Sequence, residues 1–100
     1  MGMSQQIKTG SRNIAWPWIV KAMALRGMPL QMRLIDGQLA LPDETPGDNW
    51  RELRVAWAGR MITIKRIADG VELVCWGNAD ESSLALRDAL ANVYTQSATE

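Results

Sequence analysis

The amino-acid sequence predicts a two-layer α+β fold, in which an N-terminal helix and a C-terminal helix pack on a five-stranded antiparallel sheet. Apolar and polar residues alternate through residues 30–41 and 50–77, and dipeptides that favour two-residue hairpin turns interrupt both segments. Near each end of the chain, apolar residues recur with helical spacing instead. We therefore expect a hairpin over 30–41, a meander over 50–77, and a helix on either side of them.

The length of 100 residues suits one domain that buries about 65% of the surface of its unfolded chain. The first ten residues, MGMSQQIKTG, are polar and aperiodic, so a flexible tail is expected over 1–10. A single α+β domain is then expected over 11–96, with disorder over 97–100.

The first helix should begin near Pro17, because the first turn of a helix does not need the missing N–H of proline. It should end near Arg26, because Gly27 follows, with a proline two residues later. The segment IAWPWIVKAMAL, residues 14–25, is apolar apart from Lys21. Core packing against the sheet is the main interpretation. A helix that is apolar nearly all round should be covered on more than one side, so a subunit or partner interface is the alternative.

The turn dipeptides also predict the register of the strands. Asp36-Gly37 should close the first hairpin, with four apolar residues on one side of it: Met32, Leu34, Leu39 and Leu41. The pairs expected around an Ala58-Gly59 turn are Trp57–Arg60, Val55–Ile62 and Leu53–Ile64. Those expected around an Asp69-Gly70 turn are Ala68–Val71, Arg66–Leu73 and Ile64–Cys75.

Both meander turns sort the side chains to the same two faces. The inner face is expected to collect Leu53, Val55, Trp57, Ile62, Ile64, Val71, Leu73 and Cys75. The outer face is expected to collect Glu52, Arg54, Ala56, Met61, Thr63, Lys65, Ile67, Glu72, Val74 and Trp76. On the outer face, Glu52 should lie opposite Lys65 as an exposed ion pair.

The C-terminal segment NADESSLALRDALANVYTQ predicts the second helix, with Asn78 or Asp80 as its N-cap.

Between the first hairpin and the meander, PDETPGDN at 42–49 is a polar loop, interpreted either as an ordinary crossover or as a mobile functional loop. The only cysteine, Cys75, lies in an apolar run and is expected to be a buried structural thiol. A lone cysteine also suits a reducing, cytoplasmic location.

The net charge is zero, which removes the simplest argument for a nucleic-acid or anionic-membrane partner. The charges are nevertheless segregated: residues 1–35 carry five basic residues and no acid, whereas residues 36–49 carry four acids and no base. Such a pattern indicates either a basic docking surface or two segments that meet each other. Residues 14–25 are too few to span a bilayer, so no membrane span is expected.

No chemical motif points to catalysis. Histidine is absent, which removes the usual general base and the commonest metal ligand. The carboxylate pairs Asp43-Glu44 and Asp80-Glu81 are interpreted as loop solvation and helix capping. Phosphate-binding and catalytic-serine motifs do not occur in the sequence. We expect a non-enzymatic protein without catalytic residues, cofactor, metal or small-molecule ligand.

A binding function remains, and surplus apolar residues favour protein contact. The expected role is an adaptor or chaperone-like interaction module that binds a protein partner or self-associates as a homodimer. The candidate interface residues are Trp18, Met61, Val74 and Trp76. The alternative is a nucleic-acid-binding module on the outer sheet face, with contacts from Arg54, Lys65 and Trp76.

Overall fold

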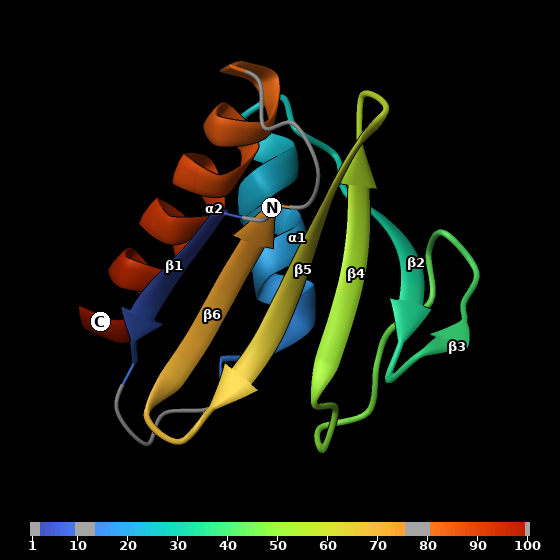
Figure 1. Cartoon of the computed structure of the whole chain (residues 1–100), viewed down its shortest axis with the longest axis horizontal. Helices are drawn as coiled ribbons and strands as arrows, with labels where there is room; N and C mark the ends of the chain where they lie inside the picture. Colours follow the sequence, from blue (N-terminus) through green and yellow to red (C-terminus); the bar gives the residue numbers. More distant parts are fainter. Residues whose placement is uncertain (1–2, 10–13, 76–80, 100) are drawn as a thin grey trace.

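A computed structural model describes residues 3–9, 14–75 and 81–99 of the chain. Within these residues, two helices lie on one face of a six-stranded antiparallel sheet (Figure 1). The elements are β1 (Met3–Lys8), α1 (Trp16–Leu25), β2 (Gln31–Ile35), β3 (Gln38–Leu39), β4 (Glu52–Trp57), β5 (Arg60–Ile67), β6 (Gly70–Cys75) and α2 (Glu81–Thr99). The strand order is β1-β6-β5-β4-β2-β3. The predicted α+β class with a helix near each end is confirmed, and the sheet has one strand more than expected.

The additional strand is β1, so the expectation of a flexible tail over 1–10 is wrong for residues 3–8. β1 pairs antiparallel with β6, from Met3 opposite Cys75 to Lys8 opposite Gly70. Its sequence is mostly polar, but Ile7 is buried in the core. The edge of β6 would otherwise present a row of unpaired backbone groups, so the pairing depends on that neighbour more than on local strand propensity.

The C-terminal helix ends three residues later than expected, at Thr99, so the expectation of disorder over 97–100 is wrong for residues 97–99. The extension is held by tertiary contact: Ser97 is buried, and its Oγ accepts a hydrogen bond of 2.7 Å from Nε1 of Trp18 on α1. The N-caps expected at Asn78 and Asp80 lie outside the described residues.

The turn between β4 and β5 has the predicted geometry. Ala58 and Gly59 have φ of 52° and 76°, and positive φ at both central residues is what a type I′ hairpin turn requires. All three predicted pairs are confirmed: Trp57–Arg60, Val55–Ile62 and Leu53–Ile64.

The turn between β5 and β6 differs from the prediction. Ile67 pairs with Gly70, so the two-residue loop is Ala68-Asp69 and the expected pairs around Asp69-Gly70 are wrong. The observed register places Ile64 opposite Leu73, which is a slip of two residues. Because side chains alternate with a period of two, this slip leaves every residue on the face predicted for it.

Gly70 is required for a reason that lies outside its own hairpin. Its φ is not in the left-handed region, so the turn does not demand a glycine there. A Cβ atom at this position would instead overlap the backbone carbonyl of Ile7 on β1. The glycine therefore permits the close approach of the neighbouring strand.

The first hairpin closes at Asp36-Gly37, both with positive φ, as predicted. Its expected apolar side is wrong, because β2 contains a bulge. Met32 pairs with Val55 and Leu34 with Arg54, so the extra residue Arg33 moves Leu34 to the outer face while Met32 stays in the core. The remaining two members of the expected apolar side are exposed: Leu39 and Leu41.

The core lies between the helices and the inner face of the sheet. Its fully buried large residues come from α1, the central strands and α2: Ile19, Met23, Leu53, Ile62, Ile64, Leu73, Leu86 and Leu90. Each such side chain contributes about 1.5–3 kcal/mol relative to exposure. The predicted inner face is buried apart from Trp57, which is half-buried, and Cys75 is a buried free thiol as predicted.

In the described part of the chain, neither helix has the length and apolar character needed to cross a membrane.

Candidate functional site

The three predicted interface residues that the structure describes do not form one surface. Trp18 is 46% exposed on α1, whereas Met61 is exposed on the outer face of β5, on the other side of the sheet. Val74 does face outward but is only 7% exposed, because the unforeseen strand β1 places Ser4 beside it. Trp76 lies outside the described residues.

Among the described residues, basic and acidic side chains alternate on the outer face of the sheet. Lys65 lies between Glu52 and Glu72 in the sheet register, and its Nζ is 3.9 Å from Oε1 of Glu52, which confirms the predicted ion pair. Arg54 is half-buried beside these alternating charges. Phosphate backbones are held by unopposed basic groups, so this arrangement adds no support to nucleic-acid binding.

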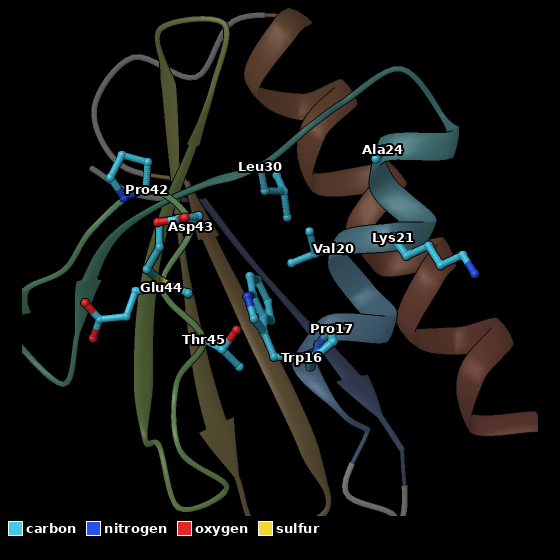
Figure 2. Close-up of a pocket in the computed structure, with 11 residues that line it drawn as sticks. Trp16, Pro17, Val20, Lys21, Ala24, Leu30, Pro42, Asp43, Glu44 and Thr45 are labelled. Atoms are coloured by element: carbon cyan, nitrogen blue, oxygen red, sulfur yellow. The ribbon is translucent and has the colours of Figure 1, made fainter.

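A cleft of about 340 Å³ lies between α1 and the segment that joins β3 to β4 (Figure 2). Its lining residues are Trp16, Pro17, Val20, Lys21, Ala24, Leu30, Met32, Pro42, Asp43, Glu44 and Thr45. Trp16, Val20 and Leu30 point into the cleft in Figure 2. The volume is at the lower end of the range for ligand pockets, which suits one large side chain or a small ligand.

The helical wall of the cleft is fixed at both ends of α1. Pro17 lies in the first turn, as predicted. At the other end, Gly27 has φ of +78°, and its N–H donates to the carbonyl of Ala24 at 3.0 Å. The N–H of Met28 donates to the carbonyl of Met23, also at 3.0 Å, which completes a Schellman motif. The proline and the Schellman motif therefore define where the helical wall of the cleft begins and ends.

The solvent side of α1 is apolar and continues into the cleft. Leu25 is 80% exposed and Trp18 is 46% exposed. Pro17 and Ala24 are exposed and also line the cleft. Lys21 is the only charged residue within α1, and Figure 2 shows its side chain extending away from the cleft.

The opposite wall is the first part of the 42–49 loop, and it is closed by hydrogen bonds. The N–H of Glu44 donates to the carbonyl of Leu41 at 3.0 Å, and a carboxylate oxygen of Glu44 accepts the N–H of Leu41 at 3.1 Å. The N–H of Met32 donates to the carbonyl of Pro42 at 2.9 Å, which ties this turn to β2. This part of the loop therefore forms a defined wall.

The far end of the loop is anchored to β5. The guanidinium of Arg66 lies 4.1 Å from the ring centre of the buried Trp50, and it donates a hydrogen bond of 2.7 Å to the carbonyl of Asp48. Of the two interpretations of the 42–49 loop, the geometry supports an ordered crossover that forms part of a cleft.

A carboxylate beside this crossover holds the start of β4. Oδ1 of Asp36 accepts the N–H groups of Glu52 at 2.9 Å and Arg51 at 2.7 Å. These backbone hydrogen bonds favour the charged form and therefore lower the pKa of Asp36 below its ordinary value. The bond from Glu52 has the larger effect, followed by the bond from Arg51. The hairpin turn, the crossover and β4 are thereby connected.

The polar residues in the lining are Thr45, Asp43, Glu44 and Lys21, whose ammonium extends away from the cleft. Among the described residues, no group of three or more potential metal ligands gathers anywhere. The only thiol, Cys75, is not in the lining, and burial raises its pKa. An apolar floor with a few charges at its rim is suited to hold an apolar group.

Sequence reasoning identified both walls, and it left open whether the basic and acidic segments that contain them meet each other or form a separate docking surface. The apolar stretch 14–25 and the loop 42–49 were each candidates, and strand order brings them together. Comparison with protein-family models, with curated proteins and with solved structures found no match for this chain.

Proposed function

We propose that the chain is a protein-binding module whose α1 surface and adjoining cleft receive an apolar side chain of a partner protein. One observation carries the proposal: the solvent side of α1 is apolar and opens into a cleft of about 340 Å³. Exposed apolar surface beside a pocket is a common feature of protein contacts.

Folding alone does not account for this surface. Ile19 and Met23 already fill the core side of α1, whereas Leu25 is 80% exposed and contributes little to the core. Burial of such a leucine by a partner would contribute about 1.5–3 kcal/mol to binding. Trp16, which is 6% exposed, supplies a well-packed floor for an anchoring side chain.

The charge on α1 favours a partner other than a second copy. Lys21 lies near the middle of the exposed apolar side of the helix. A two-fold dimer formed by packing α1 on α1 would bring the two copies of this lysine close together. Self-association through another surface stays a prediction, which sedimentation at micromolar concentration tests.

The test is selection from a displayed random-peptide library on the immobilised chain. Peptides that share an apolar residue should be enriched, and they should bind the Ala24→Arg variant at least about tenfold more weakly, because the arginine occupies the cleft mouth with a charge. Ala85→Arg is the matched control, since Ala85 is an exposed alanine on α2 outside the lining. Circular dichroism checks that both variants fold. Absence of enrichment, or equal binding to both variants, would refute the proposal.

A further inference from the structure

The two walls of the cleft carry opposite charges. The α1 wall has Lys21 and no acid, whereas the loop wall has Asp43 and Glu44 and no base. Lys21 belongs to the basic segment 1–35 and the two carboxylates belong to the acidic segment 36–49, so both charged segments of the sequence contribute to this site. A partner segment that lies across the cleft meets a cation on one side and an anion on the other.

On the loop wall, Asp43 is the carboxylate that remains for a partner. Glu44 already accepts the N–H of Leu41. Asp43 is exposed and makes no hydrogen bond or ion pair within the described ranges 3–9, 14–75 and 81–99. The bond from Met32 to the adjacent Pro42 holds this part of the chain in place, so the carboxylate has a defined position relative to the cleft.

On the helical wall, Lys21 is similarly available. Its side chain is exposed and makes no hydrogen bond or ion pair among the residues that the structure describes. Its side chain extends away from the cleft, on the solvent side of α1 (Figure 2). It can therefore meet a group of the partner beyond the helix, while the anchor occupies the cleft.

We infer that the partner segment carries a basic residue on the side of its apolar anchor that faces Asp43, and an acidic residue on the side that faces Lys21. This inference rests on the proposed function and deepens it. The two charges fix the direction in which the segment crosses the cleft, because the reversed direction places like charges together. Each exposed pair changes affinity by about 1.5- to 5-fold, and a charge reversal, which adds repulsion, by about 3- to 10-fold.

The experiment repeats the peptide selection on the wild type and on two charge-reversed variants, Asp43→Lys and Lys21→Glu. Peptides from the wild type should share a basic and an acidic residue at fixed spacings from the anchor. They should bind Asp43→Lys about 3- to 10-fold more weakly, and selection on that variant should replace the basic residue by an acidic one. Lys21→Glu should replace the acidic residue by a basic one. The control Asp88→Lys makes the same charge change on the exposed side of α2 and should select the wild-type peptides.

The outcomes separate this inference from the proposed function. If peptides with an apolar anchor are enriched and lost with Ala24→Arg, but show no charge preference or bind Asp43→Lys unchanged, the inference is overturned and the binding function stands. If no peptide is enriched on any chain, both are overturned.

Discussion

Replacement of Gly70 by alanine is expected to loosen β1 from β6. The added Cβ would overlap the carbonyl of Ile7 and also come too close to the backbone of Lys8. Backbone atoms cannot change rotamer to make room, so either β1 must shift or the β6 end of the hairpin must distort. The substitution therefore tests the strand that the amino-acid pattern did not predict.

The magnitude follows from what the shift disrupts. Overpacking of a well-packed site costs about 1–3 kcal/mol. Here the obstacle is backbone, and the shift also withdraws Ile7 from the core, whose burial contributes about 1.5–3 kcal/mol. We expect the free energy of unfolding to fall by about 2–3 kcal/mol, which for a domain of this size lowers Tm by about 8–24 °C.

Urea denaturation followed by tryptophan fluorescence measures the change, and Gly47→Ala is the matched control. A Cβ at Gly47 meets no atom within 4 Å, and its φ is not in the left-handed region, so its stability should change by less than about 1 kcal/mol. In an Ile7→Ala background, Gly70→Ala should cost at least about 1 kcal/mol less, because β1 is already weakened. Equal stability of the two glycine variants, with unchanged amide exchange across β1, would refute the reasoning.

Three further predictions concern individual groups. Trp18→Phe should lower the free energy of unfolding by about 0.5–1.5 kcal/mol, because it removes the 2.7 Å bond to Ser97; an unchanged urea midpoint would contradict this. Cys75 should react with a thiol reagent only after unfolding, because it is buried and its pKa is raised; rapid labelling in native buffer would show otherwise. The lowered pKa of Asp36 means that its carboxylate stabilises the fold above the ordinary value of 3.8 and that this contribution is lost as pH falls below it. Asp36→Asn should therefore be less stable than the wild type at pH 7, and the difference should shrink in acid; a constant difference across pH 2–7 would count against it.

The meander shows which part of a sheet the sequence can determine. The dipeptide Ala58-Gly59 specified both the turn and its register, because the two positive φ values it adopts define one hairpin geometry. The same reasoning at Asp69-Gly70 gave the correct faces with the wrong partners. Gly70 serves the packing of β1, a reason that no pattern within the hairpin contains. Period-two alternation determines faces, whereas register also depends on neighbouring strands.

Long-range pairing explains the two other differences. Ile7 is the only apolar residue between positions 4 and 8, and it is buried in the core, so the local composition hardly distinguishes β1 from a polar tail. The bulge at Arg33 is equally invisible in the alternation of β2, because it depends on pairing with β4, about twenty residues later in the chain. Between β4 and β5, where the partner strand is one tight turn away, the sequence was sufficient, because the turn dipeptide alone set the register.

The cleft raises a different difficulty, which lies in α1 itself. An amphipathic helix shows which side faces the core through the phase of its apolar residues, but a helix that is apolar nearly all round has no such phase. Ile19 in the core, Ala24 at the cleft and Leu25 in solvent are therefore indistinguishable by pattern. The distinction is made by strand order: β2 pairs with β4, and the chain between β3 and β4 returns across the start of β2, beside α1. The same uniform apolar character that conceals the orientation of the helix leaves an apolar side exposed next to the cleft, which is why α1 is the surface that the proposed partner would contact.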